Sequence, residues 1–123
     1  MAKTALDLTV EELRSYRPDR KPVEEQTETL RNEAWEVARA AAHLLRERFG
    51  VDRVVVFGSL VHREYFNRWS DIDIAAWGIP PDQFYRAVAA VTGISHEFQI
   101  NLVEPEGCRP SVRQSIEREG IDL

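Results

Sequence analysis

Two short apolar segments, separated by a polar connection, constrain the fold of this chain more than any other feature. Residues 54–59 read Val-Val-Val-Phe-Gly-Ser, and residues 70–74 read Ser-Asp-Ile-Asp-Ile. β-Branched and aromatic residues favour strands, and side chains on a strand alternate between its two faces. We therefore expect Asp71 and Asp73 to share one face of a strand, with the isoleucines on the other.

Two neighbouring carboxylates in an apolar segment repel each other and are costly to remove from water, unless a cation lies between them. Mg²⁺ accepts one or two carboxylates and keeps room for phosphate oxygens. The glycine at Gly58 permits close backbone approach, and the hydroxyl of Ser59 adds a donor for a phosphate oxygen. Together the two segments predict a metal and phosphate site for nucleotide chemistry, with Asp71 and Asp73 as metal ligands.

Length and composition place the chain among ordinary globular domains. It has 123 residues, 43% of them hydrophobic and 30% charged, and a single cysteine. We expect a cytoplasmic protein, because the sequence lacks a secretory signal and any apolar run that could span a membrane. The net charge of −5 argues against broad attraction to nucleic acid.

The chain divides into an N-terminal arm and one domain. A capping box at Thr9 and apolar residues at helical spacing predict a short helix over residues 6–16. Two prolines and four charged residues within 17–22 are expected to break it. We therefore expect a helical arm over residues 1–22 and a domain over residues 23–123.

Within the domain, helical and extended patterns alternate. An apolar stripe at helical spacing predicts a long helix that ends before Gly50. The elements expected, in chain order, are a helix over 23–49, a strand over 53–57, a helix over 58–65, a strand over 71–77, a helix carrying Phe84, Val88 and Val91, a strand over 97–103, and a helix over 111–118. This alternation predicts an α/β or α+β fold.

The segments Phe57-Gly58-Ser59 and Ser70-Asp71-Ile72-Asp73 resemble the signature of the polymerase-β-like nucleotidyltransferase superfamily. More narrowly, they are similar to the minimal nucleotidyltransferases (MNT), and the resemblance extends from about Glu28 to the end of the chain. It implies a small mixed sheet of three to four strands packed with four to five helices, and it implies Mg²⁺ and ATP. It also implies a HEPN-domain toxin as partner, which some family members silence by transferring AMP to a tyrosine.

The chain departs from the family pattern at the third carboxylate. The pattern places an aspartate within Asp-Leu-Val, and here that stretch reads Asn101-Leu-Val103. An amide carries no charge and cannot serve as a general base. Glu97 shares a face with Asn101 but lies roughly 13 Å away along a strand, and Glu104 is expected on the other face. The chain is therefore either a slow transferase or a relative that only binds.

Other polar residues near the two segments are candidates for binding the nucleotide. Ser70, Arg63 and Arg68 could contact phosphates; the alternative for the arginines is surface pairing with Glu64 or Asp71. Most tryptophans are expected to pack in the core, whereas Trp69 could meet a base or a partner protein.

Three functions follow as hypotheses. The first is Mg²⁺-dependent transfer of AMP from ATP to a partner protein, as the antitoxin of a HEPN/MNT pair. The second is a weakened or inactive subunit that neutralises a HEPN partner by docking alone. The third, transfer to a small-molecule hydroxyl, needs a substrate domain for which the chain leaves little room. A hetero-complex or homo-oligomer fits the first two.

Overall fold

A computed structural model describes residues 20–123, with side chains described from residue 26 onward. The helix expected over residues 6–16 lies outside the described residues. The described part contains one four-stranded mixed sheet, three α-helices and two 3₁₀ turns. This is the small mixed α+β fold that was expected.

The sheet has the strand order β3-β2-β1-β4, so that β2 and β1 lie in its centre. The strands are β1 (Arg53–Phe57), β2 (Ile72–Trp77), β3 (Ile100–Val103) and β4 (Ile121–Asp122). β1 pairs antiparallel with β2 and with β4, whereas β2 and β3 run parallel. The parallel pair sets Asp73 opposite Asn101.

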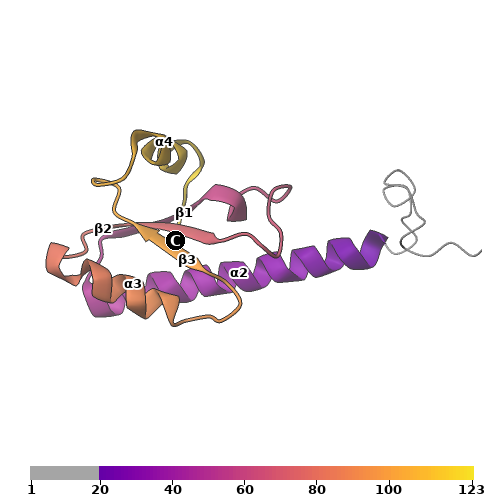
Figure 1. The fold of residues 1–123 in the computed structure, drawn as a ribbon, viewed down its shortest axis with the longest axis horizontal. Helices are drawn as coiled ribbons and strands as arrows, with labels where there is room; N and C mark the ends of the chain where they lie inside the picture. Colours follow the sequence, from indigo (N-terminus) through magenta and orange to yellow (C-terminus); the bar gives the residue numbers. More distant parts are fainter. Residues whose placement is uncertain (1–19) are drawn as a thin grey trace, which may run out of the picture.

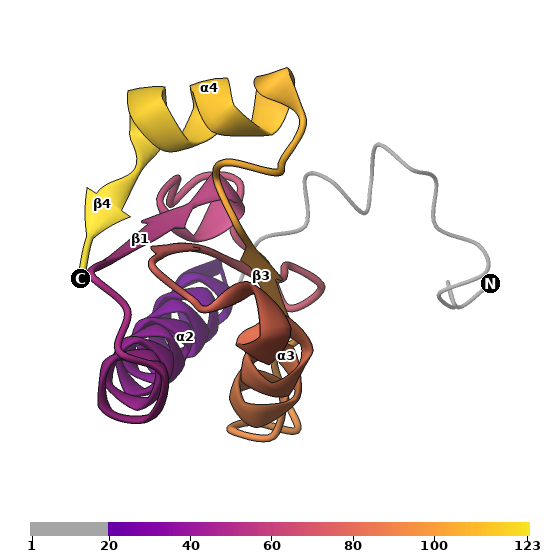
Figure 2. The ribbon, with the colours of Figure 1, turned by 90° about the vertical axis from the view of Figure 1, so that its left-hand side faces the viewer.

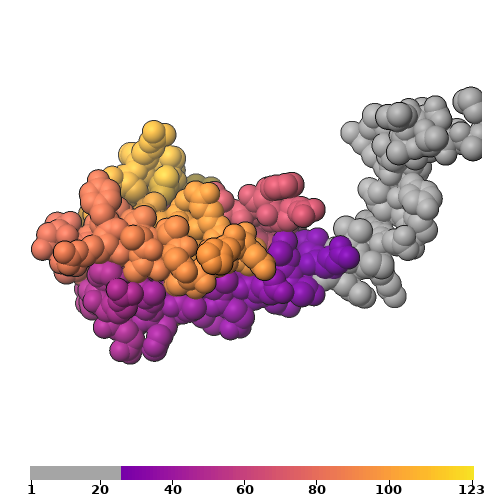
Figure 3. Space-filling model, turned by 60° about the horizontal axis from the view of Figure 1, so that its bottom comes forward, coloured from indigo at the N-terminus to yellow at the C-terminus, as the bar shows by residue number. Residues whose placement is uncertain are grey.

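Helices cover the sheet unequally on its two faces. Helices α2 (Arg20–Phe49) and α3 (Phe84–Thr92) lie side by side on one face, and α4 (Pro110–Glu119) lies on the other (Figures 1 and 2). The space-filling view shows α2 along the whole outer side of the first face, with α3 beside it (Figure 3). The domain therefore has three layers, helix pair, sheet and single helix.

Most of the core lies between the sheet and the helix pair. α2 contributes small side chains at helical spacing, which let it approach the sheet closely. The fully buried members of this core include Ala34, Ala38, Ala41, Leu45, Val54, Val56, Ile72, Ile74 and Val91. The smaller core under α4 consists of Val55, Phe57, Ala75 and Ile116. Alternate residues of β1 thus enter opposite cores.

The long helix and the first strand confirm the sequence expectation, with one change at the helix start. α2 begins at Arg20, inside the segment that was expected to break it. Pro22 falls in the first turn, where its missing N–H has no acceptor within the helix in any case. The helix ends at Phe49, and Gly50 follows with a φ of 66°, as a C-terminal glycine commonly does.

The helix expected over residues 58–65 is wrong. The structure has a single 3₁₀ turn, η1 (Gly58–Leu60), followed by irregular turns. Leu60 and Phe66 are both buried, at 0% and 3% exposure. Six residues apart on one helix they would point to different sides, so a break in the helix is needed for both to reach the core.

Two further differences concern strands. β3 begins at Ile100 rather than residue 97, because the Ser95 hydroxyl accepts the backbone N–H groups of Glu97 and Phe98 and bends the chain before the strand. β4 was not predicted, because two residues are too short for a strand pattern. It is fixed by pairing with β1 and by the bond from Leu123 N–H to the Val54 carbonyl, 2.9 Å long.

Among the described residues, no helical segment has the uninterrupted apolar length that crossing a bilayer requires.

Gly120 joins α4 to β4 at a point of close packing, which gives a test of the layer arrangement. A Cβ at this position would overlap the Ile116 carbonyl oxygen and a methyl group of Val55. We expect Gly120→Ala to lower the free energy of unfolding by about 1–3 kcal/mol through overpacking, measured by urea denaturation. Gly107→Ala is the control, since a Cβ there meets nothing within 4 Å. Equal stability of the two variants would contradict this packing.

Candidate functional site

The two aspartates share one side, as the sequence predicted, but only Asp73 lies on β2, and Asp71 immediately precedes the strand. Ile72 and Ile74 are fully buried under the helix pair, whereas Asp71 and Asp73 are half-buried on the face that carries α4. α4 packs mainly against β1 and η1, so it leaves the start of β2 accessible. The carboxylates therefore stand at the uncovered end of that face.

Asn101 joins the two carboxylates. Its side-chain Nδ2 donates to Asp71 Oδ2 at 3.1 Å and to Asp73 Oδ1 at 3.2 Å. The Asn101 Oδ1 in turn accepts a hydrogen bond from Gln99 Nε2 at 3.3 Å. The parallel register of β2 and β3 places these side chains on the same face, so the three expected residues do come together.

The electrostatics of Asp73 show the cost of this arrangement. Partial burial raises the pKa of the Asp73 carboxyl, the hydrogen bond from Asn101 opposes that shift, and the negative charge of Asp71 adds to it. A half-buried carboxylate beside another of the same sign is stabilised by any partner that offsets its charge. A proton, a hydrogen-bond donor or a bound cation each does so.

Gly58 brings the η1 turn against the carboxylate pair. It has a φ of 78°, and a Cβ at this position would overlap Asp73 Oδ2. Asp73 thus has two different sides, with Oδ1 bonded to Asn101 and Oδ2 facing the glycine. Ser59 follows in the turn, where the first N–H groups of a helical turn have no acceptor within it. The turn thus lies directly beside the carboxylates, although it lacks the following helix that was expected to favour an anion.

Arg31 supports the turn beside the site, and sequence reasoning missed this contact. From α2 its Nε donates to the Leu60 carbonyl at 3.1 Å, which closes the end of η1. Its guanidinium also lies over the Trp35 ring, 5.9 Å from the centroid. Nothing in the sequence links a helix arginine to a turn 29 residues later.

The remaining candidates lie on the loop between η1 and β2. The Ser70 hydroxyl accepts the Asn67 N–H at 3.0 Å and so shapes the turn before Asp71. Arg63 forms an ion pair with Glu28 of α2 at 2.7 Å, a partner that was not expected. Arg68 lies over the ring of Trp69, 5.2 Å from its centroid, and that ring is 82% exposed.

The donor set at the site fits Mg²⁺ in number and kind. The described residues contain no group of three or more histidine, cysteine or acidic side chains that could hold a metal ion by themselves. Mg²⁺ is commonly bound by one or two carboxylates together with substrate phosphates and water. Asp71 and Asp73 supply the carboxylates, and the Gly58-Ser59 turn lies directly beside Asp73.

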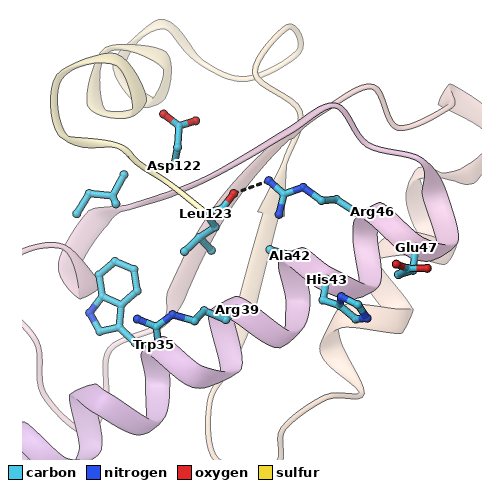
Figure 4. A pocket seen from close by; sticks show the side chains of 9 residues that line it. Trp35, Arg39, Ala42, His43, Arg46, Glu47, Asp122 and Leu123 are labelled. Carbon is cyan, nitrogen blue, oxygen red and sulfur yellow. Dashed lines mark hydrogen bonds between the residues drawn. The ribbon is translucent and has the colours of Figure 1, made fainter.

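A hollow of about 560 Å³ lies elsewhere, between α2 and the segment after α4 (Figure 4). Its walls carry Trp35, Arg39, His43 and Arg46 of α2, and Arg46 donates to the Leu123 carbonyl across it. None of its lining residues belongs to β2 or η1. It is thus separate from the carboxylate site.

Comparison with known proteins identifies the fold. No protein-family model and no curated protein matches the sequence. A structure assigned as a minimal nucleotidyltransferase has 28% identity and a TM-score of 0.55, and the match covers 79% of this chain and 95% of that one. The chain therefore has the fold of a minimal nucleotidyltransferase.

Two further matches are toxin–antitoxin structures. One is the MntA-HpeT complex with two aspartates replaced by glutamate, with 16% identity, a TM-score of 0.56, and coverage of 69% of this chain and 70% of that one. The other is a toxin–antitoxin with AMP-PNP, with 19% identity, a TM-score of 0.54, and coverage of 66% and 67%. At these identities the likeness is one of fold.

Removing the charge of Asp73 should stabilise the metal-free domain. Folding raises the pKa of Asp73 above its ordinary value, so the folded state binds the proton of this carboxyl more tightly than the unfolded state does. The free energy of unfolding therefore falls as the pH rises from the pKa of the unfolded state through the pKa of the folded state. We expect Asp73→Asn to raise the melting temperature by a few degrees at pH 7 with EDTA. The gain should vanish below pH 3.8, the ordinary value for this carboxyl. Glu117→Gln, at an exposed position on α4, should show no such gain.

Gly58 should be sensitive to a single added methyl group. Gly58→Ala combines a positive φ with an overlap on Asp73 Oδ2, so the turn or the carboxylate must move. We expect a loss of about 1–3 kcal/mol in the free energy of unfolding and weaker nucleotide binding. Gly50→Ala is the control: its φ is also positive, but a Cβ there meets nothing within 4 Å. If both variants bind nucleotide as wild type does, the turn does not contact phosphate.

Proposed function

We propose that this chain is a Mg²⁺-dependent nucleotidyltransferase that transfers AMP from ATP to a partner protein, as the antitoxin of a HEPN/MNT pair. The observation that carries the proposal is the convergence of Asp71 and Asp73 beside Gly58. Two carboxylates and a glycine turn at one accessible point match what a metal-bound nucleoside triphosphate needs.

Two of the matched solved structures add support that does not depend on the geometry of the site. One matched structure is of a toxin–antitoxin with AMP-PNP, a nucleotide analogue. In another, the replaced aspartates stand two positions apart, as Asp71 and Asp73 do. The HEPN identity of the partner rests on the family resemblance of the two sequence segments.

The residues of the site would have distinct roles. Asp71 and Asp73 would hold Mg²⁺, which neutralises phosphate charge and polarises the reacting phosphate when bound. Gly58 lets the phosphates approach the backbone, and the Ser59 hydroxyl donates to a phosphate oxygen. Asn101 keeps the two carboxylates in place. The acceptor hydroxyl forms a bond to the α-phosphorus, the bond to pyrophosphate breaks, and the acceptor proton passes to solvent.

A second function, neutralisation of the partner by docking alone, is favoured by one observation. The position opposite Asp73 is an amide that cannot take up the acceptor proton as a base. Such a site could retain nucleotide and metal while its transfer rate falls far below that of a site with a carboxylate base.

Transfer of label separates these two functions. The protein is incubated with Mg²⁺, the HEPN-domain protein of a neighbouring gene, and ATP labelled at the α- or the γ-phosphate. We expect label on the partner from α-labelled ATP only, because AMP transfer retains the α-phosphate. Asp71→Ala/Asp73→Ala should reduce it at least a hundredfold, about 3 kcal/mol.

The matched control is Asp82→Ala/Glu106→Ala, which removes two exposed carboxylates near the end of β2 opposite to Asp71 and Asp73 and should transfer normally. An unlabelled partner whose RNase activity is neutralised equally by wild type and by the Asp71/Asp73 variant would reject the transferase and support docking.

A further inference from the structure

We propose that the site takes a single divalent cation with its nucleotide, and that Asn101 is the positioning residue that sets this number. The inference rests on the proposed function and goes beyond it. It follows from the two different sides of the carboxylate pair.

One side of the pair is filled by a hydrogen-bond donor. Asn101 Nδ2 lies 3.1 Å from Asp71 Oδ2 and 3.2 Å from Asp73 Oδ1. Carboxylates only accept hydrogen bonds, so both N–H groups of this amide point at them. A cation on this side would meet the positive ends of N–H bonds and would have to displace them. The amide thus occupies the place between the carboxylates where a cation would otherwise offset their repulsion.

The other side of the pair faces the turn. Asp73 Oδ2 lies against Gly58 and takes up the space that a Cβ would occupy there, so no side chain of the turn separates the carboxylate from the backbone. A cation here meets carboxylate oxygen and phosphate oxygen together. This is the coordination that Mg²⁺ prefers, with few protein ligands and several from substrate and water.

The protein ligands at the site agree with this number. Two carboxylates, with a charge of about −2, suffice for one divalent cation that also takes phosphate oxygens. Two-metal sites hold their cations about 3.5–4 Å apart, and we expect the second cation to need a further protein carboxylate. The described residues contain no third acidic, histidine or cysteine side chain grouped with Asp71 and Asp73. The side chain opposite Asp73 is neutral.

Counting bound metal tests the inference without any measurement of activity. Mn²⁺ bound per chain is determined by equilibrium dialysis with electron paramagnetic resonance detection, in the presence of saturating AMP-PNP. We expect one Mn²⁺ per chain for wild type and two for Asn101→Asp, because the added carboxylate supplies the missing charge. Asn101→Ala removes the donor without adding charge and should keep one.

Asn67→Asp is the matched control. It makes the same chemical change in the turn before β2, where the Asn67 Oδ1 accepts the Trp69 N–H at 2.8 Å and a carboxylate can do so too. It should bind one Mn²⁺ per chain.

Thermal unfolding gives a second readout for Asn101→Asp. With EDTA, three carboxylates face one another without a donor, and we expect the melting temperature to fall by several degrees below that of wild type. Saturating Mg²⁺ should restore it. Asn67→Asp should show no cation-dependent difference from wild type.

The number of Mn²⁺ ions bound per chain distinguishes a failure of this inference from a failure of the proposed function. Two Mn²⁺ per wild-type chain would overturn the inference and leave the transferase intact. One Mn²⁺ in both wild type and Asn101→Asp would show that Asn101 does not set the number. Binding of neither Mn²⁺ nor AMP-PNP by wild type would overturn both proposals.

Discussion

The hydrogen bonds from Asn101 to Asp71 and Asp73 tie the chemistry of this domain to the register of its sheet. They exist only because β2 and β3 run parallel with Asp73 opposite Asn101. A shift of β2 by one residue would turn both carboxylates into the apolar core under α2 and α3. The desolvation of two charges opposes that shift, and the burial of Ile72 and Ile74 favours the observed register. The same residues thus define the fold and the site.

The unequal coverage of the sheet explains why the site lies where it does. The helix pair covers one face and encloses the main core, to which α2 contributes small side chains. The other face has only α4, which packs over Val55, Phe57 and Ala75. The start of β2 lies beyond this cover, so charged side chains there stay half in water. Arg31 secures the adjacent turn from the opposite layer.

The sequence predicted those parts of the structure that repeat along the chain. The apolar stripe of α2 and the β-branched run of β1 each contain enough residues to identify the element, and alternation alone placed Asp71 and Asp73 on one face. Contacts between distant segments could not be predicted in this way. The turn after Ser59 depends on Leu60 and Phe66 both reaching the core, β4 depends on its pairing with β1, and the Arg63–Glu28 ion pair joins two layers.

The central position of β2 has a consequence for how long the site keeps its geometry. Its backbone is paired on both sides, with β1 and with β3, and its amide hydrogens exchange with solvent only when the sheet opens. Asp73 lies within this paired segment, whereas Asp71 precedes it. Local fluctuations at the loop of residues 61–70 can therefore proceed without moving Asp73, which keeps its place for as long as the sheet stays closed.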